Sequence, residues 1–207
     1  MDWSFYLNRW ALPVIVTALF AWFTIYRKRV ANWLVKREKR GQPISIRFIT
    51  DGLRLPLADW RCTVLAPVLL AVGLELLVAA LFNARLTSYG EPFWFAAVTS
   101  GFLNPVAEEV LARGCLIGFS LFFFHWLYLE KLGRTATWFY YATVLVGVSL
   151  VFTASHDNYS LIQVAARFSA SMLYGALYLA SGRNLLPAIA AHAASNWFLI
   201  FADAGLA

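Results

Sequence analysis

The chain of 207 residues is 61% hydrophobic and only 14% charged, with a mean hydropathy of +0.65. Ordinary globular domains hold about 25% charged residues, so this composition excludes a soluble globular protein and indicates an integral membrane protein. The net charge of +6 does not indicate nucleic-acid binding, because the basic residues cluster between two apolar segments. Such a cluster is typical of a cytoplasmic loop that faces anionic lipid.

The first apolar segment, residues 10–26, is followed directly by Arg27, Lys28 and Arg29. A cleaved signal peptide carries its positive charge before the apolar stretch, so we predict a retained span with the N-terminus outside. Residues 27–61 hold ten basic and three acidic residues. By the positive-inside rule this segment is cytoplasmic.

The remaining apolar segments predict spans at residues 62–82, 138–155, 161–180 and 185–201. Residues 93–129 are too long for one straight span, and Asn104-Pro105 is expected to divide them, because proline disfavours helix at the residue before it. This predicts a half-helix or re-entrant segment at 93–103 and a span at 105–129. The expected fold is all-α: a polytopic transmembrane bundle of about six spans plus the half-helix. Residues 1–92 would form the N-terminal spans with the basic cytoplasmic loop, and residues 93–207 hold the motifs described next.

The first polar motif is E-E-V-L-A-R at residues 108–113, within a strongly apolar segment. A charge at the centre of a bilayer costs at least about 2.5–3.5 kcal/mol on insertion scales, so buried ionisable residues usually have a function. Glu109 and Arg113 are four residues apart and share a helix face, so they are expected to pair. Glu108 is rotated away from Arg113. The structural alternative is an ion pair beside a protonated glutamate that faces the bundle.

Two further motifs have the same spacing of four residues, Phe152 with His156 and His192 with Asn196. The Phe152 ring can pack beneath the His156 imidazole and fix its orientation. The alternatives are an interfacial histidine at a span end and a polar contact that joins two helices. In the predicted topology, however, Glu108, His156, His192 and Asn196 come from three helices and fall at similar depth. We therefore expect them to converge on one site.

These side chains suit hydrolysis. A carboxylate in an apolar site can take a proton from water and return it to a leaving amine. A histidine and an asparagine can stabilise an oxyanion, at about 3 kcal/mol for each donor. The alternative is a zinc site made by Glu108, His156 and His192. We favour a site that requires no cofactor, because an H-E-x-x-H motif is lacking and Asn196 suits an oxyanion hole better than a metal.

The ordered set E-E-x-x-x-R, F-x-x-x-H and H-x-x-x-N resembles the CPBP family of intramembrane proteases. That family includes the type II CAAX prenyl endopeptidases and bacterial proteins grouped with abortive-infection and bacteriocin self-immunity proteins. The resemblance covers residues 101–201 and makes 93–207 a CPBP-like catalytic core. It implies that Glu108 is the general base, that His156 assists it, and that His192 and Asn196 bind the oxyanion. Supporting roles would fall to Glu109, Arg113 and Phe152.

The expected function is therefore an intramembrane endopeptidase, of the glutamic type rather than a zinc metalloprotease. It would cleave a protein or peptide substrate near its C-terminus or in a membrane-associated segment. The expected location is the bacterial inner membrane, as a multi-pass protein whose partners are lipid and substrate, without nucleic acid. The rival functions are a proton-coupled transporter and a non-enzymatic bacteriocin-immunity protein. Transporters commonly show repeated halves with broken helices in both, and this sequence shows no repeat.

Overall fold

The computed structural model describes residues 13–15, 18, 60–82, 92–127, 133–156 and 160–205. Within these residues all regular secondary structure is helical, as the sequence predicts. Most of the predicted first span, nearly all of the basic segment and the loop after residue 82 lie outside the described residues. Their topology stays a prediction.

Three helices of the described chain are long and apolar enough to cross a membrane: Arg61–Leu81, Arg134–Ala154 and Leu185–Asp203. Large apolar side chains are exposed along the first of them, including Leu69, Leu76 and Leu81. An exposed apolar surface of this kind is compatible with lipid as the surrounding medium. The protein is an integral membrane protein, although this finding accounts for three of the six predicted spans.

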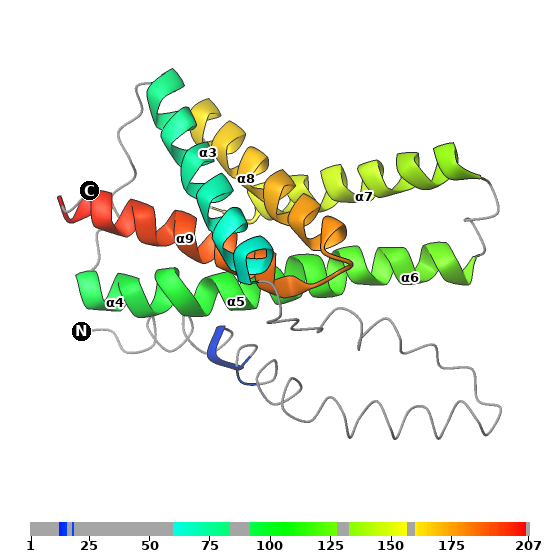
Figure 1. The fold of residues 1–207 in the computed structure, drawn as a ribbon, viewed down its shortest axis with the longest axis horizontal. Helices are drawn as coiled ribbons and strands as arrows, with labels where there is room; N and C mark the ends of the chain where they lie inside the picture. Colours follow the sequence, from blue (N-terminus) through cyan, green and yellow to red (C-terminus); the bar gives the residue numbers. More distant parts are fainter. Residues whose placement is uncertain are drawn as a thin grey trace.

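The segment from residue 93 to 126 is one uninterrupted run of helix, drawn end to end in Figure 1. It consists of α4 (Phe93–Val98), η3 (Thr99–Leu103), α5 (Asn104–Glu109), η4 (Val110–Ile117) and α6 (Gly118–Trp126), of which η3 and η4 are π-helical. Leu103 and Asn104 both keep right-handed helical backbone angles. The prediction of a separate half-helix that ends at Asn104-Pro105 was therefore wrong.

The π-helical turns of η3 explain how the helix accommodates Pro105. The backbone amide of Asn104 donates to the Thr99 carbonyl, five residues back. In the same register the Ser100 carbonyl would pair with the amide of residue 105, which in proline carries no hydrogen. The wider turn thus lets the chain stay helical while one backbone carbonyl loses its usual partner.

The remaining helices match the predicted ones closely. A π-helical turn, η2 (Arg61–Leu65), leads into α3 (Ala66–Phe82), and α8 (Leu161–Ala180) has the predicted bounds. The two other helices are longer than predicted, α7 (Arg134–Ala154) at its start and α9 (Leu185–Asp203) at its end. The N-caps of α8 and α9 are polar: Ser160 accepts from the Gln163 amide and Asn184 from the Leu186 amide, as expected at helix starts.

Helix α9 is the centre of the packing, with contacts to α3, α8, η3 and α5. Small residues allow this: Ala188 and Ala191 of α9 and Ala71 of α3 are fully buried. In Figure 1 the lower end of α3 lies over the junction where α9 meets the long helix, and α8 runs beside α3. At Gly101 an added Cβ would lie 3.0 Å from the Trp197 ring, so the glycine lets α9 approach η3 closely. This junction is where the polar motifs meet.

Candidate active site

The adjacent glutamates at the end of α5 point into different environments. Glu109 is completely buried and its Oε1 lies 3.1 Å from Arg113 Nη1, one turn further along the helix. The Glu108 side chain keeps 32% of its surface exposed. The prediction that Glu109, and not Glu108, pairs with Arg113 is confirmed. Their different partners indicate different roles for the two carboxylates.

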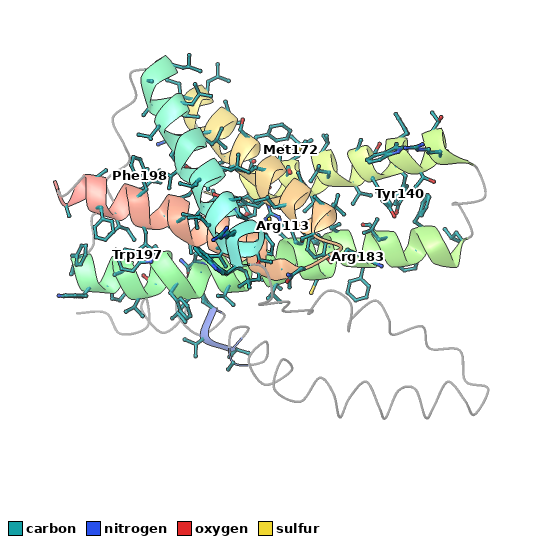
Figure 2. The ribbon with its side chains drawn as sticks, in the orientation of Figure 1. Arg113, Tyr140, Met172, Arg183, Trp197 and Phe198 are labelled. Carbon is teal, nitrogen blue, oxygen red and sulfur yellow. The ribbon has the colours of Figure 1, made fainter. Side chains whose placement is uncertain are left out.

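Arg113 is fully buried at the centre of the bundle, where Figure 2 labels it. Besides the ion pair, its Nη2 donates to the Ser171 carbonyl at 2.8 Å and to the Ser171 hydroxyl at 2.7 Å. The guanidinium also faces the rings of Phe152 and Tyr174, at 4.8 and 5.7 Å from their centroids. A buried cation is tolerated only with such partners, so Arg113 ties α8 and α7 to the long helix.

His192 of α9 bridges the two glutamates. Its Nδ1 lies 2.9 Å from Glu109 Oε1, and its Nε2 lies 3.7 Å from Glu108 Oε2. Because Glu109 is paired with a cation, its carboxylate can only accept, so Nδ1 carries a hydrogen and donates it. The ring stacks on Tyr174 at 4.9 Å and meets the edge of Phe152 at 5.9 Å. The orientation of His192 is therefore fixed on its faces and at one nitrogen.

His156 lies just beyond the end of α7 and approaches Glu108 from the other side. Its Nε2 is 3.8 Å from Glu108 Oε2, and its Nδ1 is 2.8 Å from the Phe152 carbonyl. A carbonyl can only accept, so Nδ1 donates here as well. The Phe152 and His156 rings are 4.8 Å apart, as the spacing of four residues predicts. Both histidines thus donate a hydrogen bond from Nδ1 to a neighbouring group of the protein, and both direct Nε2 toward the same Glu108 oxygen.

Asn196 lies one helical turn beyond His192. Its Nδ2 donates to the Ser100 carbonyl at 2.6 Å. In the π-helical register of η3 this carbonyl would pair with the amide of residue 105, which in proline carries no hydrogen. The sequence showed Pro105 but did not predict the hydrogen bond between Asn196 and Ser100, because that bond depends on the π-helical register of η3. Asn196 is therefore held by a backbone carbonyl at the point where the helical hydrogen-bond register meets Pro105.

Three residues that contact the site were not predicted from their sequence context as site residues. The Tyr174 hydroxyl donates to Ser195 Oγ at 2.9 Å, and both side chains are buried. Glu75 of α3 is partly buried and lies near Ser195 and His192. A carboxyl group in an apolar helix was the available signal for Glu75, and Ser195 is three residues from His192. Spacing alone does not show which helix faces them.

The donors of the alternative zinc site would be the Glu108 carboxylate and the Nε2 atoms of His156 and His192. Glu108 Oε2 is 3.7 and 3.8 Å from the two Nε2 atoms, whereas tetrahedral zinc with bonds of about 2.0–2.1 Å brings its ligand atoms closer together. Among the described residues no group of three or more His, Cys, Asp or Glu side chains is arranged to hold a metal ion.

Comparison with known proteins places these motifs in a family. A curated relative is the CDP-diacylglycerol–glycerol-3-phosphate 3-phosphatidyltransferase of Mycoplasma genitalium, 29% identical over 126 residues, which are 58% of this chain. The chain covers about half (53%) of that relative's length. No solved structure matches the chain. The family model of the type II CAAX prenyl endopeptidase Rce1-like proteins matches residues 90–198, a range that holds all three motifs. The chain belongs to this family of CAAX-type intramembrane proteases.

Proposed function

We propose that this protein is an intramembrane endopeptidase in which Glu108 activates the attacking water. The observation that supports this most directly is the environment of Glu108 Oε2. This atom is buried, has no hydrogen-bond partner among the described residues, and is faced by the Nε2 atoms of His156 and His192. Distances of 3.7 and 3.8 Å are too long for direct hydrogen bonds, but a water molecule can bridge such groups.

The proposed reaction needs no cofactor. Glu108 takes a proton from the water, whose oxygen bonds to the carbonyl carbon of the scissile peptide while the carbonyl becomes an oxyanion. His156 holds the water through Nε2. The Asn196 amide group has a second N–H besides the one bound to Ser100, and it stabilises the oxyanion together with His192. Glu108 then returns the proton to the leaving amine as the carbon–nitrogen bond breaks.

The charge of His192 follows from its contacts in this proposal. Since Nδ1 already donates to Glu109, His192 can donate to an oxyanion through Nε2 only as an imidazolium. With Glu109 neutralised by Arg113, the imidazolium also balances Glu108 before the reaction and the oxyanion after proton transfer. The summed charge of Glu108, Glu109, Arg113, His192 and the reacting carbonyl is zero in both states. In a site of low dielectric, such compensation avoids the cost of an unpaired charge.

The proposed substrates are proteins or peptides whose scissile bond lies near the C-terminus or in a membrane-associated segment. We propose that the protein acts as a multi-pass component of the bacterial inner membrane. A proton-coupled transporter would use the same carboxylates as a relay, and an immunity protein would need no Nε2 pair around Glu108. Neither alternative explains why Asn196, one turn from His192, is held in a fixed orientation by the Ser100 carbonyl.

The experiment compares wild-type protein with Glu108→Gln in proteoliposomes. The probes are an internally quenched peptide ending in a farnesylated C-A-A-X sequence and an unprenylated transmembrane peptide. Glu108→Gln keeps the shape of a partly exposed side chain, so its melting temperature should equal that of the wild type while cleavage falls by at least about a hundredfold. Full cleavage by Glu108→Gln would refute the proposal, as would proton-coupled uptake without cleavage of either probe.

A further inference from the structure

We propose that Tyr174 of α8 is a positioning residue for His192 and that Ser195 holds it in place; this rests on the proposed proteolytic function. Tyr174 belongs to none of the three polar motifs. Its ring nevertheless lies against the imidazole that is proposed to bind the oxyanion, and only 2% of the residue is exposed. An aromatic residue of a helix that carries no motif thus takes part in the site.

Tyr174 contacts α9 at two points about one turn apart. Its ring stacks on the His192 imidazole, with centroids 4.9 Å apart and an angle of 17° between the planes. Its hydroxyl donates to Ser195 Oγ at 2.9 Å, and Ser195 is itself buried. Residues three apart are neighbours on one face of a helix, so the tyrosine lies along the face of α9 that carries both contacts. A stack alone lets one ring slide over the other, whereas the second contact at the hydroxyl fixes how the two rings overlap.

Tyr174 also completes a closed set of contacts around His192. At the edge of the imidazole, Nδ1 donates to Glu109, which pairs with Arg113. Arg113 in turn donates to the carbonyl and the hydroxyl of Ser171, which lies three residues before Tyr174 on α8. Helix α8 therefore holds the imidazole twice, at its edge through these polar contacts and at its face through Tyr174. Edge and face together determine where Nε2 points.

The Tyr174 ring suits the positive charge that His192 carries in the proposed reaction. The face of an aromatic ring is electron-rich and attracts a cation. Tyr174 already contacts one cation, since the Arg113 guanidinium carbon lies 5.7 Å from its ring centroid. The imidazolium of His192 is the second, stacked on the same ring. The contact is therefore stronger when His192 is charged, which is the state it needs to donate to the oxyanion.

The first experiment observes His192 directly. The chain has only three histidines, so side-chain ¹⁵N spectra of the full-length labelled protein in micelles can be assigned with His156→Gln and His192→Gln. Tyr174→Phe, which keeps the ring and removes the hydroxyl, and Ser195→Ala should each shift the His192 ring resonances and leave those of His156 in place. Tyr174→Leu, which removes the ring, should shift them further. Tyr174→Phe carries the test alone if the leucine variant does not fold.

Tyr140→Phe is the matched control. The Tyr140 hydroxyl donates to the Ser120 carbonyl at 2.6 Å, and its ring stacks on Phe124 with centroids 4.5 Å apart. The substitution thus removes the same kind of hydrogen bond beside the same kind of stack, away from Arg113 in Figure 2. It should shift neither His156 nor His192 and should leave kcat unchanged.

The second experiment measures kinetics with the farnesylated C-A-A-X probe. Misplacement of a catalytic group by about 1 Å can cost about a hundredfold in rate. We therefore expect kcat to fall about threefold to tenfold in Tyr174→Phe and between about tenfold and a hundredfold in Tyr174→Leu. KM should change by less than about twofold, because Tyr174 is buried behind His192 and does not touch the substrate in the proposed reaction.

The double variant Tyr174→Phe/Ser195→Ala separates positioning from stability. Ser195→Ala alone leaves the buried Tyr174 hydroxyl without its acceptor, which destabilises the fold, whereas the double variant removes both partners. Its melting temperature should therefore be at least that of Ser195→Ala. Its kcat should stay close to that of the slower single variant, because both changes interrupt the same contact.

The outcomes separate the positioning role from the proposed function. Unchanged His192 resonances in the Tyr174 variants would overturn the positioning role, and so would unchanged kcat values in a protein that cleaves the probe. A kcat that recovers together with the melting temperature in the double variant would also overturn it, since stability alone would then explain the loss. A shift in Tyr174→Leu with none in Tyr174→Phe would overturn the part assigned to Ser195. Shifted His192 resonances in a protein whose wild type cleaves neither probe would support the positioning role and refute the proteolytic function.

Discussion

Glu109 Oε1 lies 2.9 Å from His192 Nδ1, although 83 positions separate the two residues in the sequence. The same oxygen also takes the ion pair with Arg113 at 3.1 Å. One buried carboxylate therefore neutralises the cation that joins three helices and sets the tautomer of a proposed catalytic imidazole. This one oxygen therefore contributes to the stability of the fold and to the proposed catalysis. The predicted pairing with Arg113 alone did not reveal the second contribution.

Glu109→Gln should lower both stability and the activity of the folded protein. The substitution leaves Arg113 buried without a counter-charge, and breaking a buried pair typically costs about 3–5 kcal/mol. It also replaces the carboxylate that fixes His192, so cleavage per folded molecule should fall about tenfold or more. Thermal melts, expression yield and cleavage normalised to folded protein measure the two effects.

Glu108→Gln is the matched comparison, with the same chemical change at the neighbouring position. It should melt like the wild type and cleave neither probe. A stable but inactive Glu109→Gln beside an active Glu108→Gln would exchange the roles of the two residues.

Pro105→Ala should reduce activity without reducing stability. Alanine restores an amide hydrogen at position 105, which can bond to a carbonyl of η3 and compete with Asn196 for Ser100. Alanine is also a better helix former, so the melting temperature should stay the same or rise. We expect kcat to fall about tenfold as Asn196 loses its fixed orientation.

Pro187→Ala is the control for Pro105→Ala. Pro187 lies in the first turn of α9, where a backbone amide has no partner within the helix. Its replacement should leave kcat unchanged. If Pro105→Ala retains wild-type kcat, the Ser100 carbonyl does not orient Asn196 in the working enzyme.

Purified protein should retain its activity in a strong chelator and contain less than one equivalent of zinc. The reason is the way in which both histidines are held. Nδ1 of His156 is bonded to the Phe152 carbonyl and Nδ1 of His192 to Glu109, and both Nε2 atoms face Glu108 at distances that suit a bridging water. Cleavage assays before and after chelation, with metal analysis of the same sample, measure this. Loss of cleavage that zinc restores would favour the metalloprotease alternative.

The segment of residues 27–61 should be cytoplasmic and both termini outside. This prediction rests on the ten basic and three acidic residues of the segment, which lies almost wholly outside the described residues. Single-cysteine probes at Ser45 and Ala207, in a background with Cys62 and Cys115 replaced, can be labelled in intact cells with an impermeant reagent. Labelling at position 45 with none at 207 would invert the topology.

The sequence predicted most of the helices and the grouping of the motif residues for a simple physical reason. A spacing of four residues places two side chains on one helix face, so Glu109 with Arg113 and Phe152 with His156 follow from the chain alone. The Asn104-Pro105 prediction failed because proline breaks an α-helix but fits the wider turn of η3. Ser195 was missed because its partner Tyr174 comes from another helix, and spacing within one helix carries no information about such packing.

Helix α3 lies outside the segment that matches the family model, but it packs against α9 inside that segment. The folding unit is therefore larger than the matched segment. Ala71 of α3 is fully buried in the same core as Ala188 and Ala191 of α9. A fragment restricted to residues 90–198 would contain every motif residue but would expose this side of α9 to lipid or detergent. Lipid can cover an apolar surface, but it cannot reproduce the close packing of these alanines. Such a fragment could keep its helices and still lose the position of α9, the helix that carries His192 and Asn196.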